Sequence, residues 1–198
     1  MPTDSPRQLR ADAQINHDRL LEVAAGVFAR DGADAVSMKE IAKEAGVGVG
    51  TLYRRFPTRE QLVEATYRNE TTRLCQAASE LLAREPAVRA LRQWMDMFVT
   101  YMTTKHGMGD ALRAILIDDG DRMRTRYLLA DAIGLLMSQG VKDGTLRDDI
   151  DPYDVLLGIG GMTLITGEPG QSARTARLLD LLLDGLTLNI NSRSRTEC

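Results

Sequence analysis

Two short helical segments joined by a glycine-containing turn constrain this chain more than any other feature. The first is expected to begin at Ser37, because Ser37 and Glu40 have the spacing of a capping box. Gly46 is suited to end it, since glycine readily adopts the left-handed backbone found at helix ends. The second segment runs from about Val49 to Phe56. This order of elements is typical of a helix-turn-helix, which places its second helix in the major groove of DNA.

One face of the second segment is expected to pack inward and the other to reach DNA. Leu52 and Phe56 are four residues apart, which puts both on the inner face. There they are expected to pack with Ile41 and with an apolar stripe of the preceding helix in a small three-helix core; the stripe consists of Leu20, Leu21, Ala24, Val27 and Phe28. The residues expected at the DNA surface are Ser37, Gly48, Val49, Gly50, Thr51, Tyr53, Arg54, Arg55 and Arg59. Within that set, Thr51 and Arg54 are expected to read base edges, whereas the tyrosine and the other two arginines are expected to contact phosphates.

The glycines at positions 46, 48 and 50 also invite comparison with nucleotide-binding loops. A dinucleotide-binding fingerprint requires a third glycine where this chain has Thr51, and a strand before the loop. Neither requirement is met. The glycines are therefore interpreted as a tight turn that lets the backbone approach a phosphate closely.

The run from Ala45 to Leu62 resembles the signature of the TetR (tetracycline-repressor) family of transcriptional regulators. Residues 20–32 resemble the first helix of that family, and the whole resemblance covers about residues 17–65. One position departs from the pattern, because Gly48 stands where the family usually has a serine that would cap the recognition helix. The resemblance implies an all-α fold, a ligand-binding helical body, a homodimer held by the last two helices and, most often, repression of transcription.

The composition of the 198 residues favours helices, because leucine and alanine are abundant and apolar runs with period two are missing. We expect an all-α fold of about nine helices. Among them are a first helix capped by Asn16 and ended by Gly32, a short separate helix at 110–116, a following helix ended by Gly140, a helix capped by Asp151, and a last helix at 172–189. The expected divisions are a flexible arm at 1–15, a helix-turn-helix domain at 16–65, a helical effector-binding and dimerisation domain at 66–190, and a frayed tail at 191–198.

Bulk charge gives no hint of a nucleic-acid partner. The net charge is −3, and residues 1–60 carry nine basic and nine acidic side chains. Binding to DNA would therefore depend on a few well-placed arginines rather than on a basic domain.

Large apolar side chains are concentrated in the middle of the chain. They are expected to line a mainly apolar pocket for a small-molecule effector, because ligands of helical bundles often bind between helices. Ordinary core packing is the competing interpretation for each of them. Arg92, Gln93 and His106 are polar neighbours able to orient a ligand. The candidate pocket residues are Trp94, Phe98, Tyr101, Met102, Tyr127 and Met162.

The last two helices are expected to form a homodimer interface. A leucine stripe at residues 178–186 and glycines at 158, 160 and 161 give them an apolar surface that allows close contact. Packing within one chain is the alternative. The dimer is favoured because a palindromic operator requires two headpieces related by a two-fold axis.

No hydrolase, zinc or phosphate-loop motif is present, so no enzymatic activity, cofactor or metal is expected. Cys75 is interpreted as structural rather than as a redox sensor, and two cysteines give no disulfide framework. Without a signal peptide or a long apolar run, a cytoplasmic protein is favoured. We therefore expect a homodimeric repressor released from a palindromic operator by a small molecule. The alternative is a helical ligand-binding protein with a vestigial DNA-binding motif.

Overall fold

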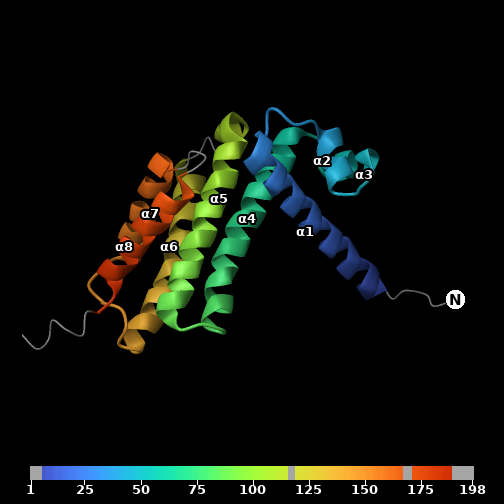
Figure 1. Cartoon of the computed structure of the whole chain (residues 1–198). Helices are drawn as coiled ribbons and strands as arrows, with labels where there is room; N and C mark the ends of the chain where they lie inside the picture. The colour runs from blue at the N-terminus through green and yellow to red at the C-terminus, as the bar shows by residue number, and fades with distance from the viewer. Residues whose placement is uncertain (1–5, 116–118, 167–170, 189–198) are drawn as a thin grey trace, which may run out of the picture. The chain divides into compact units, whose positions relative to one another are not determined.

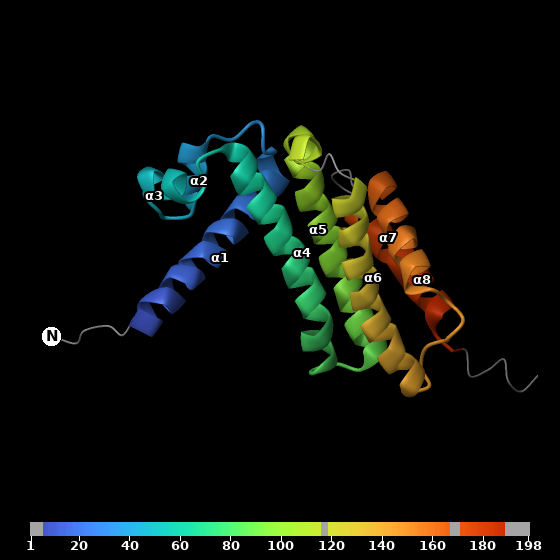
Figure 2. The same ribbon diagram turned by 180° about the vertical axis from the view of Figure 1, so that it is seen from behind.

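The computed structural model describes residues 6–115, 119–166 and 171–188, and these residues form an all-α fold. The helices are α1 (Pro6–Asp31), α2 (Met38–Glu44), α3 (Val49–Arg55), α4 (Arg59–Leu82), α5 (Ala87–Ile115), α6 (Asp119–Lys142), α7 (Pro152–Thr166) and α8 (Ser172–Leu186), coloured in chain order in Figures 1 and 2. None of the described helices is both long enough and apolar enough to cross a membrane.

Contacts divide the chain into two compact units. We call Met1–Thr72 with Thr103–Asp119 the headpiece, and Arg73–Met102 with Gly120–Cys198 the body. The headpiece extends past residue 65, where the sequence placed the end of the helix-turn-helix domain, and it takes in a distant segment of α5. Two long helices, α4 and α5, therefore supply residues to both units.

The headpiece core forms where α1, α2 and α3 pack together. The apolar residues predicted on α1, among them Leu20, Val27 and Phe28, are buried at helical spacing. Ile41 of α2 and Leu52 of α3 are fully buried as well. The three-helix core expected from the sequence is thus confirmed.

The start predicted for the first helix is wrong. α1 begins at Pro6, not at Asn16, so much of the expected flexible arm is helical. Proline suits the first position of a helix, because its fixed φ is helical and its missing N–H would have no partner there. The end of α1 agrees with the prediction, since Gly32 follows it with a positive φ of 84°. Residues 1–5 lie outside the described residues.

Two of the helix boundaries expected from the sequence involve glycines. The short helix expected at 110–116 follows a break, because the backbone of α5 is non-helical at Gly109 (φ 38°, ψ −120°) and residues 110–115 form a helical segment of their own, while position 116 lies outside the described residues. Gly140 does not end a helix but lies inside α6, and Gly144, with φ 67°, follows that helix instead. Gly140 is needed for packing, because an added Cβ would lie 2.4 Å from Cδ1 of Leu146.

The last two helices of the body, α7 and α8, pack side by side (Figures 1 and 2). Asp151 caps α7 as expected, since its carboxylate accepts a hydrogen bond from the Tyr153 amide at 2.8 Å. α8 ends at Leu186, earlier than expected, because the chain becomes extended there. An antiparallel bridge between Leu146 and Thr187 fixes that end. Position 189 and the expected tail lie outside the described residues.

Candidate nucleic-acid interface

The recognition helix, α3, presents an exposed outer face. It begins after Gly48, whose backbone is extended (φ −65°, ψ 138°) and whose position provides no capping side chain. Leu52 and Phe56 are buried beneath it, whereas Tyr53 is 47% exposed. Of the residues predicted to contact DNA, all except Arg59 are exposed. The geometry therefore leaves the outer face of α3 open to a duplex.

The helix before it, α2, is fixed by the predicted capping box. The Ser37 hydroxyl accepts a hydrogen bond from the Glu40 amide at 3.2 Å, and the Glu40 carboxylate accepts one from the Ser37 amide at 2.8 Å. The Ser37 amide and hydroxyl together hold the pKa of the Glu40 carboxyl below its usual value. Because the box occupies the Ser37 hydroxyl, this residue has a structural task whether or not it also contacts DNA.

His17 of α1 packs on the residue that ends the recognition helix. Its ring stacks on Phe56 with the centroids 5.7 Å apart and the planes at 21°. Partial burial, followed by the nearby positive charge of Arg55, lowers the pKa of His17. The neutral imidazole therefore belongs to the folded headpiece. The sequence alone did not indicate this contact, because it joins residues 39 positions apart.

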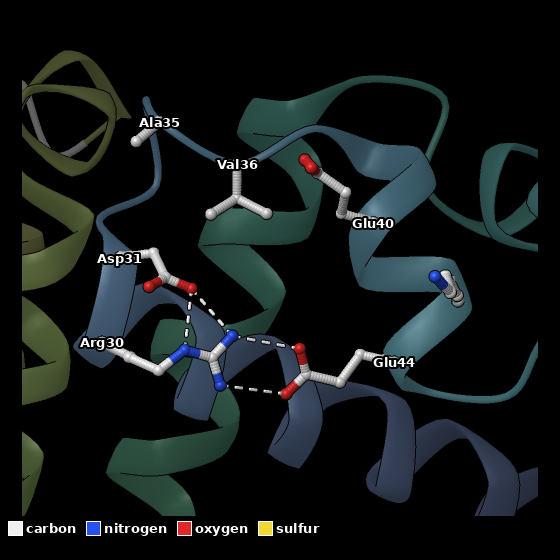
Figure 3. Close-up of a pocket in the computed structure, with 7 residues that line it drawn as sticks. Arg30, Asp31, Ala35, Val36, Glu40 and Glu44 are labelled. Carbon is white, nitrogen blue, oxygen red and sulfur yellow. Dashed lines mark hydrogen bonds and ion pairs between the residues drawn. The ribbon is translucent and has the colours of Figure 1, made fainter.

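A charged groove of about 560 Å³ lies between the end of α1 and α2 (Figure 3). Arg30 reaches across it and donates two hydrogen bonds to the Glu44 carboxylate, both 3.1 Å long. Arg30 also pairs with Asp31, and Glu40 is held in its capping box. The charges in the groove therefore join α1 to α2 and orient the helix-turn-helix.

Arg59 lies where the sequence predicted a phosphate contact, at the first position of α4, but its guanidinium faces the protein. It is half-buried, and it donates a hydrogen bond to the backbone carbonyl of Ala33. Ala33 belongs to the connection between α1 and α2 and is itself buried. The hydrogen bond to Ala33 could not be predicted from the sequence, because an arginine at the start of a helix is equally consistent with a phosphate contact.

In the body, three of the predicted pocket residues form a buried aromatic row along α5. Trp94 and Phe98 stack with centroids 5.7 Å apart, and Phe98 and Tyr101 follow at 5.9 Å. The indole N–H of Trp94 donates to the Leu74 carbonyl of α4 at 2.8 Å. All three rings are almost completely buried, so they pack as core residues in the single chain. A ligand in contact with them would have to be enclosed by the protein as well.

The other three predicted pocket residues are less buried. Met102 and Met162 are half-buried, but the Tyr127 side chain is 57% exposed and its ring lies 5.8 Å from that of Tyr153. Tyr127 therefore does not join the row formed by Trp94. A tyrosine on an amphipathic helix cannot be assigned to the inner or outer face when apolar residues occur on both.

Two polar residues of the body have structural partners. The Arg92 guanidinium lies 2.6 Å from carboxylate oxygens of both Asp96 and Asp180, which joins α5 to α8. The Cys75 thiol is half-buried and lies 3.6 Å from the Leu128 carbonyl oxygen, and burial raises its pKa. A raised pKa disfavours the reactive thiolate, which supports the structural interpretation of this cysteine.

The outer face of α7 is apolar, whereas the exposed residues of α8 are mainly polar or charged, with Leu181 as the exception among the large side chains. Leu164 is 68% exposed, Ile165 79% and Leu181 69%. Leu157 is also half-exposed, and Gly161 lies between it and Leu164 with no atom of the chain within 4 Å of a built Cβ. These residues recur at helical spacing, so they form one continuous apolar face on α7.

Two family models match the chain. Residues 20–66 match the bacterial regulatory proteins of the tetR family, and residues 86–188 match the C-terminal domain of SbtR-like transcriptional regulators. An HTH-type transcriptional regulator of Staphylococcus aureus (strain USA300) is 44% identical over 54 residues, or 27% of this chain. That match spans only 29% of the length of the Staphylococcus protein.

Solved structures extend the similarity over nearly the whole chain. A TetR transcriptional regulator of Streptomyces coelicolor is 45% identical, with a TM-score of 0.80, over 87% of this chain and 98% of that one. A TetR regulatory protein of Mycobacterium vanbaalenii is 32% identical, with a TM-score of 0.73, over 91% of this chain and 99% of that one. Together with the exposed recognition helix, these matches assign the function: the chain belongs to the TetR family of DNA-binding transcriptional regulators.

Proposed function

We propose that this regulator is a homodimeric repressor that a small, largely apolar molecule releases from a palindromic operator. The exposed apolar face of α7 carries the proposal, because a second copy of the chain packed on it would bring two headpieces together. Large side chains such as Leu164, Ile165 and Leu181 expose most of their surface in the single chain. Contiguous apolar surface of this kind marks interfaces in proteins.

A dimer of this kind suits a two-fold symmetric operator. Two recognition helices about one helical turn of DNA apart, roughly 34–36 Å, would enter successive major grooves. Thr51 and Arg54 would then read base edges, while Tyr53 and Arg55 contact phosphates. The capping box of α2 and the exposed outer face of α3 favour this over a vestigial motif, since a helix without a binding task has no need to keep such a face clear.

The aromatic row of the body supports an apolar effector. Trp94, Phe98 and Tyr101 are buried in the single chain, so a ligand would reach their flat rings only after neighbouring side chains move. The half-buried Met102 and Met162 are flexible enough to make that room. An effector that binds better to the released state shifts the population toward it, with α4 linking the body to the headpiece.

The experiment uses the single tryptophan of the chain as a reporter. Apolar compounds are screened for a change in Trp94 fluorescence, and those that act are titrated into the complex with the tightest duplex selected from a random pool. Linkage requires the compound to weaken DNA binding and DNA to weaken compound binding by the same factor. Compounds that move the fluorescence but leave DNA affinity unchanged would contradict release by an effector.

A further inference from the structure

The connection between α1 and α2 is held from two sides at one residue. The Ala33 amide donates a hydrogen bond to the Gly107 carbonyl of α5 at 2.7 Å. The Ala33 carbonyl accepts the hydrogen bond from the Arg59 guanidinium of α4. Both backbone polar groups of this buried residue therefore have hydrogen-bond partners on elements that lie far away in the sequence.

No side chain other than hydrogen fits at Gly107. A Cβ built there would lie 1.9 Å from the carbonyl oxygen of Phe28 and 3.1 Å from Cα of Ala29. The backbone of α5 therefore lies directly against the last turn of α1. A side chain at this position would have to push the two backbones apart, because neither is the flexible end of a side chain.

The surrounding part of α5 is built into the headpiece. Thr104, Met108 and Leu112 recur every four residues and are almost completely buried in this unit. The Lys105 ammonium lies 6.0 Å from the centre of the Tyr67 ring of α4. Burial along this stripe holds Gly107 in place, so the hydrogen bond to Ala33 has a rigid acceptor.

We propose that Arg59 and Gly107 are positioning residues for DNA recognition. By holding Ala33 between them they fix the short connection that ends at the α2 cap, and with it the orientation of α2 and α3 on α1. Neither residue needs to touch DNA for this. The proposal rests on DNA binding by α3. It also means that the segment of α5 around Gly107 contributes to DNA recognition without contacting DNA.

Salt dependence separates this task from the phosphate contact that the sequence predicted for Arg59. Loss of one phosphate contact lowers the slope of log K against log salt concentration by about 0.9 per headpiece. A positioning residue lowers affinity and leaves that slope unchanged, because the number of neutralised phosphates stays the same. The Arg59→Met variant keeps the apolar stem and removes the donor and the charge.

The test measures binding of the tightest selected duplex by fluorescence anisotropy at several salt concentrations. It compares the wild type, Arg59→Met, Gly107→Ala and the double variant. Arg59→Met is expected to weaken binding by about tenfold, as for loss of one hydrogen bond in each of two headpieces. Gly107→Ala should weaken it at least as much, because its Cβ would push the backbone of α5 away from the end of α1. Because both act through Ala33, the double variant should bind no more weakly than the weaker single variant, with the wild-type salt slope throughout.

Gly26→Ala is the matched control, since Gly26 lies on α1 with no atom within 4 Å of a built Cβ. It should bind like the wild type. Circular dichroism confirms that each variant is folded at the temperature used, and Arg59→Met still decides the matter if Gly107→Ala is not folded. A slope lowered by about 0.9 per headpiece in Arg59→Met would overturn the proposal. So would wild-type affinity in folded Gly107→Ala, or losses that add in the double variant.

Discussion

The headpiece and the body expose different kinds of side chain. Around the recognition helix the exposed residues are mainly polar or basic, such as Thr51, Arg54 and Arg55, and the nearby carboxylates are held in caps or ion pairs. On α7 of the body the exposed residues are mainly large and apolar, such as Leu164 and Ile165.

This difference indicates which kind of partner suits the exposed surface of each unit. The exposed side chains of the headpiece are well solvated when no partner is bound. They also suit a polyanion, because arginines and hydroxyls can exchange their hydrogen bonds to water for hydrogen bonds to phosphate oxygens and base edges. The apolar face of the body is costly in water and suits another apolar face, most simply that of a second copy of the chain. Substitutions on each of the two surfaces test this difference.

Gly161→Arg should separate the two copies. Gly161 is exposed in the apolar face of α7, with room for a side chain in the single chain but not in a tightly packed dimer. Loss of the dimer should weaken binding to a palindromic duplex by about 100-fold or more, because two linked contacts become independent. Analytical ultracentrifugation checks the mass in solution.

Met97→Asp on α5 serves as the control, because Met97 is an exposed apolar residue outside α7 and α8. It should remain dimeric. A dimer of normal affinity in Gly161→Arg would place the interface elsewhere.

Arg54→Ala should change which sequences are bound more than how tightly DNA is bound in general. An arginine that forms a bidentate contact with guanine contributes about 1–3 kcal/mol of discrimination against other bases. Selection from a random pool, repeated with the variant, should therefore show relaxed preference at one position in each half-site. Unchanged preference, with affinity lowered equally for every duplex, would make Arg54 a phosphate ligand instead.

Whether a structural feature could be predicted from the sequence depends on how far apart along the chain its interacting residues lie. The capping box of Ser37, the end of α1 at Gly32 and the inward face of Leu52 follow from neighbours within one or two helical turns, and all are confirmed. Gly140 was misread because its partner, Leu146, approaches only after the chain has turned at Gly144. A glycine inside a helix gives the same local signal whether it ends the helix or makes room for a neighbour.

In the candidate DNA-binding surface and the body, too, the predictions succeed for local features and fail for contacts between distant segments. Exposure of Thr51, Tyr53 and Arg54 follows from helical periodicity. The contacts of Arg59 with Ala33 and of Gly107 with the end of α1 do not, because they join segments that only the tertiary fold brings together. In the same way, periodicity placed Trp94, Phe98 and Tyr101 on one face but could not assign Tyr127 to it.

The smallest expected effect concerns pH and the headpiece core. Burial lowers the pKa of His17 in the folded state, so folding favours the neutral ring. This contribution to stability is complete above the unfolded pKa of about 6.5 and is lost as the pH falls below it. In His17→Gln, the free energy of unfolding should therefore depend less on pH between about 7 and 5.

His106 makes a useful comparison for that experiment. Burial and the neighbouring Lys105 lower its pKa too, so His106→Gln should remove a separate part of the same pH dependence. Urea unfolding at a series of pH values measures both. If His17→Gln keeps the full wild-type dependence, the stacked ring on Phe56 does not favour the neutral form.

The division of tasks between the two units is tested most directly by the stoichiometry of the DNA complex. The wild-type protein is titrated into the tightest selected duplex and, separately, into a duplex that carries one half-site of it. We predict two chains on the full duplex and, for the half-site, an affinity lower by about 100-fold or more with the salt slope reduced by about half. A single chain on the full duplex, or equal affinity for the two duplexes, would contradict the account.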